Sequence, residues 1–136
     1  MASVHKDVLV EVDAARAWSM LRDLGGAAAL FAGVLKDSRL EGDVRTVTFA
    51  NGATVRERIV DIDEDRRRVA YAVVGGAFTH HNASMQIVTE GAHACRFVWT
   101  TDLLPDSLVE RVAPLMEAGC EALKRNLEQQ IAPSRR

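Results

Sequence analysis

Four side chains in the middle of the chain have the chemistry needed to bind or transform a small molecule. Arg45 can hold a carboxylate or a carbonyl oxygen, and Glu57 can accept a proton. Tyr71 and His81 can each donate a hydrogen bond to a ligand oxygen, and His81 joins Glu57 as a candidate catalytic residue. Because the four residues lie in different strand-like segments, they form one site only if they face the same side of a sheet.

The segment from Arg45 to Glu57 has the pattern of a β-hairpin. Two alternating runs flank an Asn-Gly dipeptide at 51–52, which is the strongest short-range signal for a hairpin turn. A two-residue loop would mix apolar and polar side chains on both faces of the hairpin. A three-residue loop at 50–52 pairs apolar with apolar residues, and it leaves the other face polar. We therefore expect this second register, which sets Arg45 opposite Glu57 on the apolar, inward face.

The following segments alternate between apolar and polar residues with a period of two. This alternation places Tyr71 on the same face as Val69, and His81 on the same face as Met85. The pattern is typical of an antiparallel sheet with one side in water.

Each of these polar residues also has a purely structural interpretation. An unpaired charge on a buried face is costly, so Arg45 and Glu57 could form a cross-strand ion pair with no further role. Buried tyrosine and histidine side chains usually find a partner within the core, and Tyr71 and His81 could do the same. The alternative is that all four supply polar contacts to a ligand.

Further candidate ligand contacts are residues that are expected to face the interior. A large apolar side chain that points inward either fills the core or lines a cavity, and in a fold that encloses a cavity the two roles overlap. Gly119 costs about 1 kcal/mol relative to alanine inside a helix, and we expect it to leave a gap that faces the sheet. These candidates are Trp18, Phe31, Phe49, Trp99, Met116 and Gly119.

Helices are expected before and after the strand-like segments. A first strand at 8–12 leads to Asp13, whose side chain can cap a helix at 14–24, and a short helix follows at 27–31. The chain closes with an amphipathic segment, whose main helix we expect at 113–130 with a kink or break at Pro114. Its apolar stripe comprises Leu108, Val112, Leu115, Met116, Gly119, Cys120, Leu123, Leu127 and Ile131.

Length and charge limit the classes of function. The chain has 136 residues and a net charge of −2, which fits a single domain at 1–132 with a disordered tail at 133–136. Basic residues are spread along the chain, so neither nucleic acid nor a membrane is an expected partner. No apolar signal segment begins the sequence, and we expect a cytoplasmic protein, either a monomer or a homodimer.

Familiar catalytic motifs are absent from the sequence. It contains no Gly-x-Ser-x-Gly elbow, no glycine-rich nucleotide loop and no His-Glu-x-x-His motif. His80 and His81 are adjacent in a strand and point to opposite faces, so we expect no metal site, and no cofactor is expected. Cys95 and Cys120 are expected to be reduced, buried thiols.

Six features occur in a characteristic order, namely the opening at 8–24, Arg45, the segments 57–60, 65–71 and 97–101, and the terminal helix. With them the layout resembles the START-like, or polyketide cyclase-like, superfamily, often abbreviated SRPBCC. This resemblance implies an α+β helix-grip fold, in which a curved antiparallel sheet of about seven strands wraps around a long C-terminal helix and encloses an apolar cavity. The two short helices expected at 14–24 and 27–31 follow the first strand. Members bind lipids, hormones or polyketides, act as cyclases or aromatases, or serve as oxygenase domains. The Cys-His cluster motifs of the oxygenase branch are absent here.

Three functions remain open from the sequence. The leading hypothesis is a protein that binds a small apolar or aromatic molecule, lipid-like or polyketide-like, in a cavity between the sheet and the C-terminal helix. An enzyme of the cyclase, aromatase or dehydratase type would use the same cavity, with its polar residues moving protons. A third possibility is an interaction protein whose cavity has collapsed.

Overall fold

Alternating residues in the middle of the chain form an antiparallel sheet, as the sequence predicts. The structure is a computed structural model that describes residues 1–131, so the tail predicted at 133–136 lies outside the described residues. Within this range the sheet has seven strands in the order β1-β7-β6-β5-β4-β3-β2, which places the first strand against the last. The strands are β1 (Ala2–Val10), β2 (Leu35–Glu41), β3 (Val44–Phe49), β4 (Thr54–Asp63), β5 (Arg68–Val73), β6 (His80–Thr89) and β7 (Cys95–Leu104).

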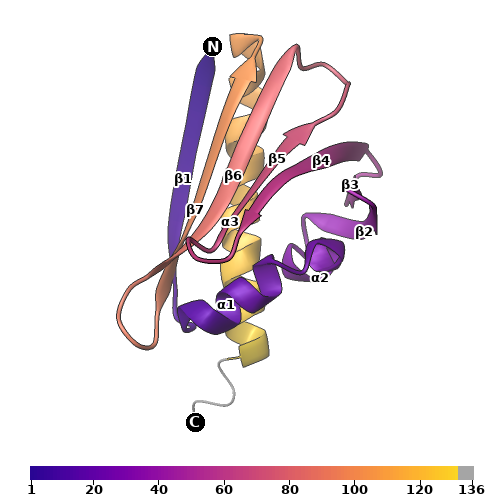
Figure 1. Cartoon of the computed structure of the whole chain (residues 1–136). Coiled ribbons are helices and arrows are strands. Elements are labelled where there is room, and N and C mark those ends of the chain that lie inside the picture. Colours follow the sequence, from indigo (N-terminus) through magenta and orange to yellow (C-terminus); the bar gives the residue numbers. More distant parts are fainter. Residues whose placement is uncertain (132–136) are drawn as a thin grey trace.

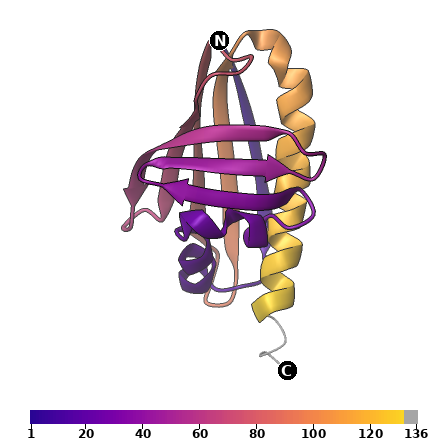
Figure 2. The same cartoon turned by 90° about the vertical axis from the view of Figure 1, so that its right-hand side faces the viewer.

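Helices pack on the inner side of this sheet. The sheet curls so that β2, β3 and β4 reach across toward the long C-terminal helix, while β1 and β7 run beside it (Figures 1 and 2). Short 3₁₀ turns precede two of the helices, at Leu24–Gly26 and Asp106–Leu108. The helices are α1 (Ala14–Leu21), α2 (Ala27–Leu30) and α3 (Val109–Ile131). None of them has the length and apolar composition needed to cross a membrane.

The start of α1 follows the sequence signal at Asp13. The Asp13 carboxylate accepts a hydrogen bond from the backbone N–H of Arg16, which satisfies one of the free donors at the helix start. Ala17, Trp18 and Leu21 form the buried face of the helix. This face anchors α1 to the core.

The β3–β4 hairpin has the predicted register. Val47 pairs with Val55, and Arg45 pairs with Glu57. Gly52 in the three-residue loop has a φ of 92°, a conformation that side chains with a Cβ rarely adopt. The loop therefore puts Arg45 and Glu57 on the inner face.

The predicted break at Pro114 is wrong. The helix α3 begins at Val109 and continues through Pro114 to Ile131. Proline lacks an N–H, so the Glu110 carbonyl loses one intrahelical partner. The exposed proline points away from the core, and apolar residues before and after it, Val112 and Met116, pack on the same cluster, which holds the helix together across the missing bond.

The predicted apolar stripe of α3 also needs a correction. Leu115 is 40% exposed, whereas Ala122 is 1% exposed and belongs to the core. Met116, Cys120, Leu123 and Leu127 face the interior, as predicted. The side chain of Ile131 lies outside the described part of the structure.

Two apolar clusters fill the space between the sheet and the helices. The main cluster joins the inner face of the sheet to α1, α2 and the C-terminal half of α3. A smaller cluster contains Val4, Leu103 and Met116, near the start of α3. The Trp99 side chain packs against both clusters and therefore lies at their junction.

Candidate functional site

Arg45 and Glu57 form a buried ion pair across β3 and β4. Their exposed fractions are 5% and 9%. Both Nε and Nη2 of Arg45 lie 2.8 Å from Oε1 of Glu57, and Arg45 Nη1 donates to the Leu24 carbonyl at 3.4 Å. All hydrogen bonds that Glu57 makes to the described residues use the same oxygen, Oε1. The second oxygen, Oε2, is left to accept a hydrogen bond or a proton from another molecule.

Burial changes the acidity of Glu57. Removal from water raises the pKa of this carboxyl, and the positive charge of Arg45 offsets part of the rise. A carboxyl with a raised pKa takes up protons more readily than an exposed one. Glu57 is therefore suited to accept a proton from a bound molecule.

Tyr71 on β5 lies beside this ion pair. Its side chain is 3% exposed, and the Arg45 guanidinium carbon is 5.6 Å from the centre of its ring. The Tyr71 hydroxyl accepts a hydrogen bond of 3.1 Å from Nε1 of Trp99. Burial first, and the charge of Glu57 second, raise the pKa of Tyr71. The hydroxyl thus keeps its proton and can donate it to an acceptor on a ligand.

His81 on β6 is held in a neutral form. Its Nδ1 accepts a hydrogen bond of 3.0 Å from the backbone N–H of Val73, so the neutral ring carries its proton on Nε2. Burial, and then the neighbouring His80, lower the pKa of His81 to about 4. Its ring centre lies 5.9 Å from that of Tyr71 and 4.9 Å from that of Phe78. His81 is therefore a second hydrogen-bond donor on the same face.

The gap expected at Gly119 does not exist, because the ring of Trp99 fills it. A Cβ atom on Gly119 would lie 2.6 Å from Cζ3 of Trp99, which is far too close for two carbon atoms. The same ring packs against Phe31 and Phe97, with ring centres 5.9 and 6.1 Å away. Gly119 thus allows the indole to lie directly against α3.

The three remaining predicted ligand contacts are Trp18, Phe49 and Met116. Trp18 donates to a carboxylate oxygen of Glu64 at 2.7 Å and so links α1 to the turn after β4. Met116 belongs to the smaller apolar cluster, against which Trp99 and Phe78 also pack, and Phe49 is partly buried at the end of β3. The structure brings together the other seven, namely Phe31, Arg45, Glu57, Tyr71, His81, Trp99 and Gly119.

Residues 1–131 match the family described as polyketide cyclase/dehydrase and lipid transport. The chain belongs to this family. None of the curated proteins matches it in sequence. The membership agrees with the resemblance seen in the sequence, and it covers every element that builds the candidate site.

Solved structures show that this family member has the helix-grip fold. An uncharacterised protein from Bacillus thuringiensis superposes with a TM-score of 0.83 at 15% identity, over 91% of this chain and 97% of that one. Norcoclaurine synthase from Thalictrum flavum, in complex with dopamine and hydroxybenzaldehyde, gives 0.73 at 19% identity, over 94% and 87%. The di-domain aromatase/cyclase BexL, from the BE-7585A biosynthetic pathway, gives 0.81 at 13% identity, over 94% of this chain and 47% of that one.

Two contributors to the site were missed in the sequence. Phe78, just before β6, packs edge-on against His81, and its only sequence signal is an aromatic residue close to an expected inward-facing strand. The Leu24 carbonyl accepts from Arg45. A backbone acceptor has no residue-type signal, so only the folded chain reveals it.

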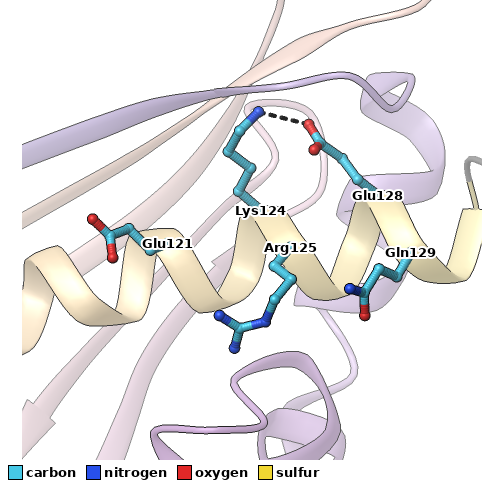
Figure 3. A pocket seen from close by; sticks show the side chains of 5 residues that line it. All are labelled: Glu121, Lys124, Arg125, Glu128 and Gln129. Carbon is cyan, nitrogen blue, oxygen red and sulfur yellow. Dashed lines mark hydrogen bonds and ion pairs between the residues drawn. The ribbon is translucent and has the colours of Figure 1, made fainter.

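A hollow on α3 lies on its outer side, away from this site. It is lined by Glu121, Lys124, Arg125, Glu128 and Gln129 (Figure 3). Lys124 Nζ donates to the Leu9 carbonyl at 2.9 Å and to Glu128 at 2.7 Å, and Arg125 donates to the Ala32 carbonyl at 3.0 Å. These side chains connect α3 to neighbouring segments, so we assign the residues around the hollow a structural role.

No metal-binding arrangement accompanies the site. Within residues 1–131, no three His, Cys, Asp or Glu side chains gather closely enough to hold a metal ion. Burial raises the pKa of Cys95 to about 11 and that of Cys120 to about 12. Both thiols are free and buried.

Proposed function

We propose that the protein binds a small aromatic or apolar molecule between the inner face of the sheet and α3. The polar end of this molecule lies against Tyr71, His81 and the Arg45–Glu57 pair. The observation that carries the proposal is the buried Tyr71 hydroxyl, whose one hydrogen bond to the described residues is a bond that it accepts. Its proton is free for a ligand oxygen, and the neighbouring Nε2–H of His81 adds a second donor.

The apolar surroundings support this proposal. On the sheet face beside Tyr71, the side chains of Val73, Phe78 and Trp99 are only partly buried, although they point inward. Covering such apolar surface contributes about 25 cal/mol for each Å² removed from water. A flat aromatic molecule would gain this energy while its oxygen reaches the donors.

The relatives support the same class of ligand. The family description names lipid transport beside cyclase and dehydrase activities, and norcoclaurine synthase holds dopamine and hydroxybenzaldehyde, two small aromatic molecules that carry oxygen. We infer that an aromatic ring with an oxygen acceptor suits this chain as well.

The test measures binding of 2-acetylnaphthalene, with 2-ethylnaphthalene as a control of similar shape that lacks the carbonyl oxygen. We expect the ketone to bind more tightly, and Tyr71→Phe to weaken ketone binding about fivefold, as loss of one hydrogen bond of about 1 kcal/mol implies. The same substitution should leave binding of the hydrocarbon unchanged. Equal binding of both molecules to the wild type would contradict the proposed polar end.

Native mass spectrometry gives an independent test. Protein purified without denaturation should carry a co-purified small molecule in part of the sample. The Tyr71→Phe variant should carry less of it. A uniformly empty wild-type protein that also fails to bind either naphthalene would argue against a binding function.

An enzymatic function of the cyclase or dehydratase type is the second candidate, and it rests on Glu57. The free oxygen of this carboxylate could remove a proton from the carbon beside a ligand carbonyl, while Tyr71 donates to the carbonyl oxygen. The C–H bond breaks, its electron pair forms an enolate, and Glu57 holds the proton. Return of a solvent deuteron to the same carbon then exchanges hydrogen for deuterium.

The enzymatic candidate is tested by NMR with 2-acetylnaphthalene in D₂O. The wild type should accelerate deuterium uptake at the methyl group, and Glu57→Gln should abolish the acceleration while ketone binding survives. Equal loss of binding and exchange would assign Glu57 a structural role. His80→Asn, on the opposite face of β6, is the matched control and should exchange at the wild-type rate.

The third candidate, an interaction protein, would be expected to present a broad apolar patch. Large apolar side chains that are more than a third exposed occur on several separate elements, and they include Leu9 on β1, Leu40 on β2, Val60 on β4, Val88 on β6 and Leu115 on α3. Their dispersal gives this candidate less support than the buried polar groups give to ligand binding.

A further inference from the structure

We propose that the indole of Trp99 occupies part of the ligand site when the site is empty, and that the bound molecule displaces it. This inference rests on the proposed function and deepens it by naming the ligand class. The ligand is a planar molecule with two fused rings that carries an N–H or O–H donor.

The indole of Trp99 lies between a cluster of tilted aromatic rings and the backbone of α3. Phe31 and Phe97 contact the indole with ring centres 5.9 and 6.1 Å away. On the side of α3, Gly119 offers bare backbone, where a Cβ would come within 2.6 Å of the indole. Once the indole has left, the space between these rings and α3 fits another flat two-ring molecule of similar size.

The hydrogen bond of Trp99 defines what can replace it. Its Nε1 donates to the Tyr71 hydroxyl at 3.1 Å, the same hydroxyl that forms the centre of the candidate site. A ligand with a donor exchanges one hydrogen bond for another, so displacement costs little. A ligand without a donor leaves the buried Tyr71 oxygen with no hydrogen bond to replace the one from Trp99. An unsatisfied buried acceptor carries a desolvation cost.

The position of Trp99 allows it to leave. The inward-facing neighbours on β7, Cys95, Phe97 and Leu103, are 0% exposed, whereas Trp99 is partly exposed. It lies where the two apolar clusters meet and packs against each of them. The ring can therefore turn toward solvent without crossing the fully buried core.

The decisive experiment follows the indole N–H signals of ¹⁵N-labelled protein by NMR. The sequence has two tryptophans, so Trp18, bonded to Glu64, serves as the internal control. Unlabelled indole is titrated, with benzofuran as the probe of the same shape that lacks a donor. We expect indole to shift the Trp99 signal and to leave the Trp18 signal in place, and benzofuran to bind at least fivefold more weakly. Equal binding of the two probes would overturn the inference.

The variant Trp99→Phe distinguishes a Trp99 that the ligand displaces from a Trp99 that lines the ligand site. Phenylalanine has no donor for Tyr71 and is smaller, so indole should bind this variant severalfold more tightly than it binds the wild type. Weaker binding would show that Trp99 lines the site, and it would overturn the inference. Circular dichroism checks that the variant is folded, and if it is not, the titrations of the wild type decide.

Failure of this inference can be told apart from failure of the proposed function. If 2-acetylnaphthalene binds in a Tyr71-dependent manner while the Trp99 signal stays unchanged on addition of indole, the binding function stands and displacement is wrong. If neither indole nor 2-acetylnaphthalene binds, both are wrong.

Discussion

At the scale of single residues, the inner face of the sheet combines charges and hydrogen-bond donors that rarely occur together in a core. Arg45, Glu57 and Tyr71 are each less than 10% exposed, and His81 is half-buried beside them. Among the described residues, no fully buried side-chain nitrogen or oxygen atom lacks a hydrogen-bond partner, so the unpartnered Oε2 of Glu57 keeps some exposed surface. Pairing of these groups within the core lets the protein bury them.

Replacing one partner of the Arg45–Glu57 ion pair should destabilise the fold more than replacing both partners. Glu57→Leu leaves the Arg45 charge buried without a partner and should lower the free energy of unfolding by about 3–5 kcal/mol. The double variant Arg45→Met/Glu57→Leu should recover most of this loss because no charge remains unpaired. Urea unfolding of both variants measures the difference. A double variant as unstable as the single one would mean that the pair itself stabilises the fold.

His81 should make stability depend on pH. Its pKa falls from 6.5 to about 4 on folding, so the unfolded chain binds the proton more readily. Stability is fully present above pH 6.5 and declines as the pH falls toward 4, by an amount on the order of 1 kcal/mol because solvent reaches the ring.

The variant His81→Asn cannot be protonated, and its side-chain oxygen can still accept from the Val73 N–H. It should flatten the stability curve between pH 6.5 and 4, measured by urea unfolding across this range. His80→Asn is the control on the exposed face of the same strand and should retain the wild-type slope. An unchanged slope for His81→Asn would assign the pH dependence to other groups.

At the scale of elements, the contact between α3 and β7 depends on a residue with no side chain. Glycine is a poor helix former, so alanine at position 119 would by propensity alone stabilise α3 by about 1 kcal/mol. The contact with Trp99 opposes this gain, because the new methyl group would lie 2.6 Å from the indole. The sequence predicts a gap at Gly119, whereas the structure shows close packing against Trp99.

We predict that Gly119→Ala destabilises the protein by about 1–3 kcal/mol, the usual cost of overpacking a core. In the background of Trp99→Phe the smaller ring leaves room, so the same change should be neutral or stabilising. Thermal unfolding of the four proteins in this cycle measures the coupling. Additive effects would show that the indole does not lie against Gly119.

At the scale of the whole molecule, the first and last strands in the sequence, β1 and β7, lie next to each other in the sheet. β1 and β7 pair from Ala2 opposite Leu103 to Val10 opposite Cys95, and α3 packs mainly against β1. The N-terminal strand thus joins the end of the sheet to the C-terminal helix. Residues on its inner face should contribute to the stability of the whole domain.

The pair Val10→Ala and Leu9→Ala tests this arrangement. Val10 is 0% exposed and its neighbour Leu9 is 39% exposed. Val10→Ala should cost about 2 kcal/mol, and Leu9→Ala less than about 1 kcal/mol, although leucine loses more atoms. Urea unfolding measures both. A larger loss for Leu9→Ala would reverse the assignment of the two faces of β1.

Local rules account for the part of the site that could be predicted. The Asn-Gly turn and the period of two determine which residues of the hairpin face each other, so the pairing of Arg45 with Glu57 could be inferred without coordinates. The same period placed Tyr71 and His81 on the inner face. These features depend on residues close together in the chain, and the family membership extends them to the helix-grip fold.

The sequence by itself thus determined the faces of the strands, the cap at Asp13 and the class of fold. Tertiary structure alone decided which inward residues meet. Trp18 donates to Glu64, whereas Trp99 packs against Gly119 and donates to the Tyr71 hydroxyl. Tertiary structure also carried α3 unbroken through Pro114. The reason is that such contacts join segments many residues apart. Their outcome depends on the shape and volume of every neighbouring side chain, which no local pattern records.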